Sequence, residues 1–404
     1  MYVTCKVNRA AQGLFYSGII HNDNDKYTFV YDCGTDSPGC AGNMSVLCES
    51  ICEFKSQIDK KIDLLIISHF HYDHISGIQE LLEGIKVDTV VMPYTSDIER
   101  LLYIASFDKD LTDNERTLME NPASYFAQCG VNLVIIVGTP EDNNDDSIPQ
   151  KENPSQTPQS DIIYSPHDEG GKWEPLIDAS SNRNRGNCYF YSKDIAIHCR
   201  LGWEFLIYSD PSAVSSLESL HTDIKNLTNG DIRRYLKSCN KDMLKKIKLL
   251  YDGHLVKRSL NQQSVLVISR PKYPCLYDYV NVIWDYRSVY PLRSSTCTSV
   301  LLGDIPIRHS PNAIQFLRDN LSNGEIFAVL LPHHGSRDGI HKCVMPFFSD
   351  TLIYIASYGK KRVKTRNHPH MAHLIKTVDS MFCFVPVNDL NDFQYTVCFS
   401  HLNV

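Results

Sequence analysis

The chain has 404 residues, of which 43% are hydrophobic and 22% charged, so it can bury a sizeable core and is not a mainly disordered chain. Its formal net charge of -7 excludes a histone-like polycation that binds duplex DNA over its whole surface, although a local basic patch is compatible with it. No apolar run approaches the roughly 20 residues of a spanning helix, and the first residues lack the shape of a signal peptide, so we expect a cytoplasmic protein without membrane contact.

The first 140 residues alternate strands and helices, which indicates an α/β fold. Short apolar or β-branched runs predict strands over residues 27–31, 62–67, 87–92 and 131–137. Apolar residues recur at helical spacing between 75 and 85, and a helical region is predicted between 98 and 126.

Two segments interrupt this alternation. Residues 139–187 are polar and contain NNDD, NPSQTPQS and SSNRNRGN, so we expect a surface loop insertion. Residues 211–257 have a helical pattern with a cluster of lysines and form a second, helical insertion. Strands are predicted again over 188–191, 195–198, 203–208, 264–269, 280–284, 299–302, 327–331, 352–356, 383–387 and 395–399, with a helix over 312–321. The two insertions account for the length, so we predict one domain over residues 1–404.

The 14 cysteines include no C-x-x-C pair. Cys48 and Cys52 lie one helical turn apart, without a histidine cluster beside them. We expect the cysteines to be reduced and mostly buried as small hydrophobic side chains, with a structural zinc site as the alternative.

The densest group of metal-binding residue types is an H-x-H-x-D-H motif, His69, His71, Asp73 and His74. It follows directly on the predicted buried strand at 62–67 and so lies at the carboxyl end of that strand. Alternate residues of an extended segment point the same way, so His69, His71 and Asp73 can converge, while His74 turns away where a helix begins. Three imidazoles and a carboxylate suit Zn²⁺, Mn²⁺ or iron.

With this motif the chain resembles the metallo-β-lactamase fold superfamily, and the resemblance covers most of its length. Asp32-Cys33-Gly34 is similar to the family's D-x-G, whose Asp is a structural or supporting residue. Leu302-Gly303-Asp304 is similar to the later G-D, whose Asp bridges two metals, and Asn367-His368-Pro369 is similar to the segment of the last metal histidine. The resemblance implies a four-layer αββα sandwich with the metal ligands His69, His71, Asp73, His74, Asp304 and His368.

A second motif, His333-His334-Gly335-Ser336, follows a predicted strand about 30 residues after Asp304. It is similar to the H-H-G-S of the soluble domain of the DNA-uptake protein ComEC and its relatives, as is the turn at 261–264 before the strand SVLVIS. That resemblance implies that His333 or His334 assists the leaving oxygen or stabilises the charge of the transition state. Structural hydrogen bonding beneath the site is the alternative for this pair.

The chain departs from the family pattern at the third histidine of the first metal site. His167, His198 and His221 lie in the polar insertion, in a strand and in the helical insertion, and each is more typical of a core or surface histidine. His254 is the least poor candidate. The missing ligand is common in ComEC-like domains, so we expect one or two ions, Zn²⁺ or Mn²⁺.

These ligands imply hydrolysis by a metal-activated water, because a bound metal lowers the pKa of water from 15.7 to roughly 7. Asp304 would bridge the two ions, and Asp73 would ligate the second ion and orient the nucleophile. No serine, cysteine or lysine nucleophile is required.

Five cations directly before His368 indicate the substrate: Lys360, Lys361, Arg362, Lys364 and Arg366. Cations beside metal ions suit a phosphodiester, so we expect a phosphodiesterase or nuclease with a nucleic acid or nucleotide substrate. A solvated basic loop is the alternative reading of this run. The other functions considered are an ester, thioester, lactone or β-lactam hydrolase and, from a different class, a non-catalytic sensing module, which the complete H-x-H-x-D-H motif disfavours.

Overall fold

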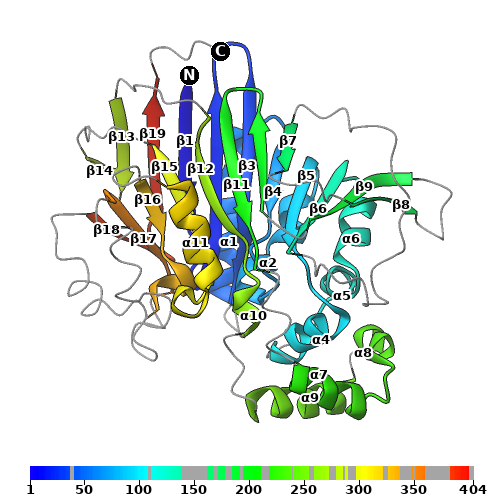
Figure 1. The fold of residues 1–404 in the computed structure, drawn as a ribbon. Coiled ribbons are helices and arrows are strands. Elements are labelled where there is room, and N and C mark those ends of the chain that lie inside the picture. The colour runs from blue at the N-terminus through cyan, green and yellow to red at the C-terminus, as the bar shows by residue number, and fades with distance from the viewer. Residues whose placement is uncertain are drawn as a thin grey trace.

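The computed structural model describes residues 1–36, 41–107, 111–138, 162–166, 172–177, 184–191, 194–210, 218–238, 240–253, 259–272, 279–284, 287–289, 297–321, 326–336, 348, 351–359 and 383–399. In these ranges two β-sheets face each other, and helices cover their outer faces (Figure 1). This arrangement confirms the predicted α/β class and is consistent with the predicted four-layer αββα sandwich. Among the described helices, none is both long and apolar enough to cross a bilayer.

The first sheet has the strand order β14-β13-β19-β1-β2-β3-β4-β5-β6-β9-β8. From β3 to β9 neighbouring strands run parallel, so their carboxyl ends meet at one edge of the sheet. The bounds of these strands are β1 Tyr2–Val7, β2 Gly13–His21, β3 Lys26–Thr35, β4 Lys61–Ile66, β5 Lys86–Pro93, β6 Leu133–Val137, β8 Lys172–Ile177, β9 Asn184–Tyr191, β13 Tyr279–Trp284, β14 Arg287–Val289 and β19 Phe393–Cys398.

The second sheet has the strand order β18-β17-β16-β15-β12-β11-β10-β7. Its strands β15 to β18 are parallel, and β12 is antiparallel to β15, so the start of β12 lies beside the carboxyl end of β15. The bounds are β7 Ile162–Pro166, β10 Ile195–Cys199, β11 Trp203–Tyr208, β12 Leu266–Pro271, β15 Thr298–Leu301, β16 Ile326–Leu330, β17 Ile353–Ser357 and β18 Cys383–Val387.

Central strands are apolar on both faces, because each sheet packs against the other sheet on one face and against helices on the other. In β6, Leu133, Ile135 and Val137 face the core between the sheets, while Val134 and Ile136 face the helices. Such strands read as continuous apolar runs, which is why the sequence predicts β4, β5 and β6 so directly. The core between the sheets also holds Trp203 and Phe205 of β11, both fully buried.

α1 (Ala41–Gln57), α3 (Ile78–Leu82) and α6 (Pro122–Gln128) pack on the first sheet, and the other helices on that side share one apolar core with them. α11 (Pro311–Asn320) covers the second sheet instead and contributes Ala313 and Leu317 to its outer core. The remaining helices are α2 Tyr72–Ile75, α4 Asp97–Ser106, α5 Asp113–Glu120, α7 Glu218–Leu227, α8 Ile232–Ser238, α9 Lys241–Gly253 and α10 Ser259–Gln262, with short 3₁₀ turns η2 at Ile307–His309 and η3 at Pro332–Gly335.

The predicted insertions take different forms in the described residues. Within 139–187, where the sequence predicts a loop, the structure has β7, β8 and the start of β9. β7 and β8 are the last strands of their sheets, and an edge strand needs fewer apolar residues than a central one, so their polar surroundings conceal them. Within 211–257 lie α7, α8 and α9, which pack against α4 or one another.

Candidate metal centre

The loop after β4 carries the H-x-H-x-D-H motif into the space between the two sheets. β4 ends at Ile66, and α2 begins at Tyr72, so the ligand residues occupy the turn between strand and helix. His69 and His74 are almost completely buried, whereas His71 and Asp73 are half-buried. His71 precedes α2 with extended backbone angles, which keeps its side chain near that of His69.

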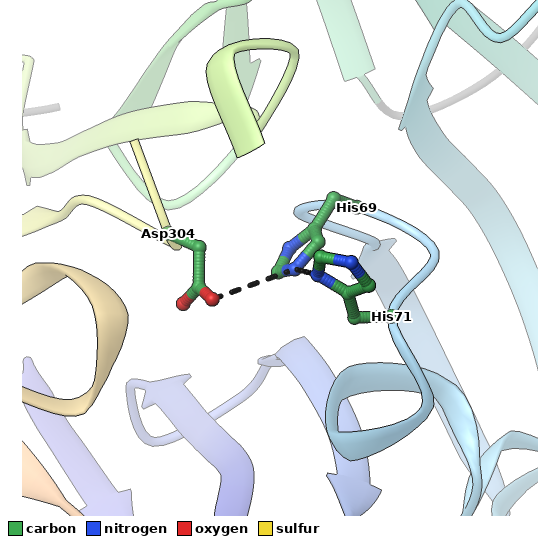
Figure 2. A group of neighbouring side chains, drawn as sticks. All are labelled: His69, His71 and Asp304. Carbon is green, nitrogen blue, oxygen red and sulfur yellow. Dashed lines mark hydrogen bonds and ion pairs between the residues drawn. The ribbon is translucent and has the colours of Figure 1, made fainter. Parts of the chain in front are cut away.

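Asp304 of the second sheet completes a first group with two of these histidines, His69 and His71. One ligand atom from each residue lies within 4.8 Å of the others. The His69 Nε2 atom is 2.9 Å from His71 Nδ1 and 3.7 Å from Asp304 Oδ2. Figure 2 shows the two imidazoles and the carboxylate pointing toward one another from opposite sides of the site.

Asp73, His74 and His334 form a second group of the same size. His334 Nε2 lies 3.0 Å from Asp73 Oδ2, and His74 Nε2 lies 3.9 Å from Asp73 Oδ1. Asp304 links the two groups, because its other oxygen, Oδ1, is 3.4 Å from His74 Nε2. One carboxylate therefore faces a histidine of each group.

Asp32 and Ser68 orient His74 and His69 through hydrogen bonds. The Asp32 carboxylate accepts hydrogen bonds from the Ser68 backbone N–H (2.6 Å), from the Ser68 hydroxyl (2.6 Å) and from His74 Nδ1 (2.8 Å). Because Nδ1 of His74 donates to a carboxylate, its Nε2 is the atom presented to Asp304 and Asp73. The Ser68 hydroxyl also lies 2.9 Å from His69 Nδ1.

The Asp32-Cys33-Gly34 segment ends in glycine because the backbone of the ligand loop passes close to Gly34. A Cβ atom at Gly34 would lie 2.5 Å from the carbonyl carbon of His74 and 2.6 Å from that of Asp73. Such a contact cannot form without moving the ligand backbone, so glycine is required here by close approach. Asp32 itself has a φ of 58°, a left-handed conformation that Asp tolerates better than most residues.

Burial and charge set the protonation of the six side chains. Burial lowers the pKa of His69 well below its usual value and that of His71 to about 4, so both imidazoles are neutral and can offer a lone pair. Burial opposes ionisation of Asp73 and Asp304, but His74 beside them holds the pKa of both carboxyls below the usual range. Burial likewise opposes the charge on His74 and His334, yet the adjacent carboxylates raise the pKa of both imidazoles.

Two buried atoms show that the groups fit a divalent cation. Among the described residues, His74 Nε2 and Asp304 Oδ1 are buried without a hydrogen-bond partner, and they face each other. Buried polar atoms without partners cost free energy, and a cation held between the carboxylates and imidazoles would satisfy both. Histidine nitrogens with carboxylate oxygens suit Zn²⁺ or Mn²⁺. The two groups could hold one ion each.

The H-H-G-S segment lies at the carboxyl end of β16. It faces the loop between β4 and α2 that carries the H-x-H-x-D-H motif. Its His334 ring is held between Asp73 and the Ser357 carbonyl, which lies 2.8 Å from His334 Nδ1. The His333 backbone N–H donates to the Gly303 carbonyl (3.0 Å) and ties this segment to the turn that carries Asp304. His333 and His334 both have left-handed φ angles, 50° and 55°, which are strained for residues with a side chain. The strained turn places His334, rather than His333, against Asp73.

A wall beside the first group comes from α4 and the turn after α10. The Tyr103 ring of α4 lies 5.0 Å from the His71 ring, and its hydroxyl donates to the Leu260 carbonyl at 3.0 Å. The Gln263 side chain donates to the buried Glu99 carboxylate. The Ser264 hydroxyl accepts a hydrogen bond of 3.4 Å from the Asp304 backbone N–H. The 261–264 turn noted in the sequence thus supports the Asp304 segment.

The structure brings six of the predicted site residues together: His69, His71, Asp73, His74, Asp304 and His334. His333 lies beside them, with its ring centre 6.4 Å from that of His334. His368 and the basic run Lys360, Lys361, Arg362, Lys364 and Arg366 lie outside the described residues, as do His167 and His254. His198 pairs with Glu204 on the second sheet instead (3.4 Å).

Sequence reasoning missed Ser68, Tyr103 and Ser357 as supports of this site. Ser68 could have been found, because it directly precedes His69 and follows the buried strand. Tyr103 and Ser357 carry no signal in the sequence, since their contacts depend on how α4 and β17 are placed.

Residues 16–100 match the family model of the metallo-beta-lactamase superfamily. This stretch runs from β2 into α4 and contains Asp32 and the whole H-x-H-x-D-H motif. Over this stretch the chain is therefore similar to the metallo-beta-lactamase superfamily. The solved structure of the metallo-beta-lactamase MIM-1 from Novosphingobium pentaromativorans aligns at 11% identity over 63% of this chain and 89% of its own, with a TM-score of 0.18. No curated protein matches the chain.

Proposed function

We propose that this protein is a metal-dependent hydrolase that cleaves phosphodiesters and holds one or two Zn²⁺ or Mn²⁺ ions. The observation that carries the proposal is the pair of ligand groups that meet at Asp304, where two buried ligand atoms lack a hydrogen-bond partner among the described residues. The superfamily consists mostly of metallohydrolases, which supports hydrolysis. The phosphodiester and the ComEC-like branch rest on the H-H-G-S motif and on the basic run at 360–366.

The ligand residues form two sets, one for each ion. His69 and His71, neutral at pH 7, would hold the first ion with Asp304. His74, Asp73 and His334 would hold the second. A bound cation of this kind lowers the pKa of water and polarises the bond under attack. Asp32 and Ser68 keep His74 and His69 oriented throughout, through hydrogen bonds that do not involve the cation.

Asp73 is the carboxylate suited to orient the attacking water. Its side chain is 20% exposed, against 4% for Asp304, so water can reach it. His333, half-buried at the mouth of the same turn, is placed to donate to a phosphoryl or leaving oxygen. This assigns separate roles to the two histidines of the H-H-G-S motif.

A substrate panel tests the proposal. Protein reconstituted with Zn²⁺ or Mn²⁺ would be offered bis-p-nitrophenyl phosphate, single- and double-stranded DNA, RNA, cyclic dinucleotides and nitrocefin, with Asp304→Asn as the inactive control. Turnover of a phosphodiester that the control lacks supports the proposal. Turnover of nitrocefin or an ester in its absence would assign the protein to the other hydrolase class, and no turnover with metal bound would favour a sensing module.

A further inference from the structure

Helices α8 and α9 concentrate positive charge in an otherwise acidic protein. Residues 232–253 contain seven basic and two acidic side chains, within a chain whose net charge is -7. The basic residues are Arg233, Arg234, Lys237, Lys241, Lys245, Lys246 and Lys248. This segment forms part of the predicted helical insertion and has no part in the metal centre.

The two helices turn their apolar faces inward and their cations outward. Ile232 and Leu236 of α8, with Ile247 and Tyr251 of α9, are buried in the core that they share with α4. Of the seven basic side chains, all but Lys248 are exposed, and Lys248 is half-buried. The charge is therefore presented to solvent over both helices.

Part of this charge is not neutralised by acidic neighbours. Arg233 pairs with Asp97 (2.9 Å), and Lys237 pairs with Glu120 (3.5 Å). In the part of the chain that the structure describes, Arg234, Lys245 and Lys246 form no ion pair. These three cations are free to bind an external anion.

One helix, α4, connects this surface to the metal centre. α4 contacts α8 and α9 on one side and places Tyr103 against His71 on the other. α4 therefore lies between the α8–α9 pair and His71. Figure 1 shows α4 beside α7 and α9, below α10.

The composition of the exposed face favours a polyanion over a lipid bilayer. Leu249 is 72% exposed, and it is the only large apolar side chain of α8 and α9 with such exposure in the described structure. A bilayer-binding helix needs a continuous apolar face to insert, and here the apolar face is already buried.

We propose that the α8–α9 surface docks a single strand of nucleic acid whose scissile phosphodiester lies at the metal centre. The inference rests on the proposed function and names its substrate as a strand of several nucleotides. A single strand can bend around α4, whereas duplex DNA, with a persistence length of about 50 nm, cannot follow so short a curved path.

The test measures binding without turnover. Full-length protein in EDTA is titrated into fluorescein-labelled oligothymidylate of 20 nucleotides, and anisotropy is recorded at several salt concentrations. The variant is Lys245→Gln with Lys246→Gln. The matched control is Lys60→Gln with Lys86→Gln, which removes the same charge from exposed lysines at the amino ends of β4 and β5, the opposite edge of the sheet. Circular dichroism melts verify that each variant is folded.

We expect the α8–α9 variant to bind several-fold more weakly than wild type at 100 mM salt. The slope of log Kd against log salt should fall by about 1.4, at roughly 0.7 for each single-strand phosphate contact. The control should bind like wild type. Equal weakening by both variants would overturn the inference, because diffuse charge would then explain the binding.

Two further results would also overturn it: no binding of oligothymidylate by wild type, or binding of phosphatidylserine vesicles in its place. Hydrolysis of bis-p-nitrophenyl phosphate by metal-loaded wild type separates this inference from the proposed function. If that hydrolysis is absent while binding depends on Lys245 and Lys246, the docking surface stands and the proposed function fails. If hydrolysis is present and binding does not depend on these lysines, the proposed function stands and the docking surface fails.

Discussion

Asp304 is the residue on which the two ligand groups depend. Its Oδ2 faces His69 and its Oδ1 faces His74, so the loss of one negative charge changes both groups at once. Asparagine has nearly the same shape as aspartate, but its amide is a poor bridging ligand. The Asp304→Asn substitution therefore removes the negative charge with little change in packing.

We predict that Asp304→Asn folds but loses activity. The far-UV circular dichroism spectrum should match wild type, while turnover falls by more than about 100-fold, beyond the 10–100-fold typical for residues that only support a ligand. Steady-state assays with bis-p-nitrophenyl phosphate measure this. Wild-type turnover in a folded Asp304→Asn variant would contradict the bridging role.

The two histidines of the H-H-G-S motif should respond differently to substitution. His334→Ala removes the imidazole that contacts Asp73, so bound metal should fall by about one ion per chain in elemental analysis. His333→Gly should keep the metal. Its stability should stay within about 1 kcal/mol of wild type, because relief of the left-handed backbone offsets the greater freedom of glycine in the unfolded chain. Equal metal loss in both variants would refute the distinction.

At the scale of elements, α4 links the metal centre to the helical insertion. Its amino end is fixed by a capping box, in which the Ser96 hydroxyl accepts from the Glu99 N–H and the Glu99 carboxylate accepts from the Ser96 N–H. The same carboxylate accepts from Gln263 before β12. Glu99 is fully buried, and burial raises its pKa to about 7, against the lowering effect of these hydrogen bonds and of Arg100.

Glu99 therefore predicts a pH dependence of stability. A carboxyl whose pKa is raised on folding favours the folded state below its unfolded pKa of 4.5, and this contribution is lost as the pH rises through about 7. The stability of wild type relative to Glu99→Gln should thus decrease by on the order of 2 kcal/mol between pH 5 and pH 8.

Urea unfolding in EDTA at the two pH values measures this difference. The exposed Glu83→Gln is the control, and its stability relative to wild type should stay constant. If Glu99→Gln shows the same constant offset, Glu99 does not titrate in this range.

At the scale of the whole molecule, the ligands come from both sheets. The H-x-H-x-D-H loop follows β4 of the first sheet, whereas Asp304 and His334 follow β15 and β16 of the second. A bound ion would therefore hold the two sheets together at this end. Without it, the buried carboxylates depend on protons carried by His74 and His334.

Removal of metal should lower the thermal stability of wild type. A ligand at 100 times its Kd contributes about 2.7 kcal/mol, which corresponds to a shift of several degrees in Tm. Differential scanning fluorimetry with and without EDTA measures this shift. His69→Ala with His71→Ala should retain little metal and should lose most of the response to EDTA. An unchanged response in this double variant would refute the ligand assignment.

Much of the architecture could be predicted from the sequence because the central strands are short apolar runs. β4, β5 and β6 are buried on both faces, so their residues need no alternation and are conspicuous. α1 has no counterpart among the predicted elements, although Leu47, Ile51, Phe54 and Ile58 recur at helical spacing and are buried. β7 and β8 could not be predicted, because edge strands in a polar segment carry no periodic signal.

The candidate site was predictable where its residues are consecutive. The spacing of His69, His71, Asp73 and His74 on one loop fixes their convergence locally. The choice between His333 and His334 could not be made, since it depends on two left-handed residues that direct one ring toward Asp73. The role of the helical insertion as a neighbour of the site likewise depends on α4, which lies between them.

The first and last described strands lie side by side, and this has a consequence for biosynthesis. Thr4 of β1 and Thr396 of β19 share a hydrogen bond across 392 residues of chain. At 5–20 residues per second, a ribosome needs roughly 20–80 s to make the partner of β1 after β1 itself has been translated. During that interval one side of β1 has unpaired backbone groups that can recruit another nascent chain. The β1–β2 hairpin is thus the segment that a chaperone would have to shield longest.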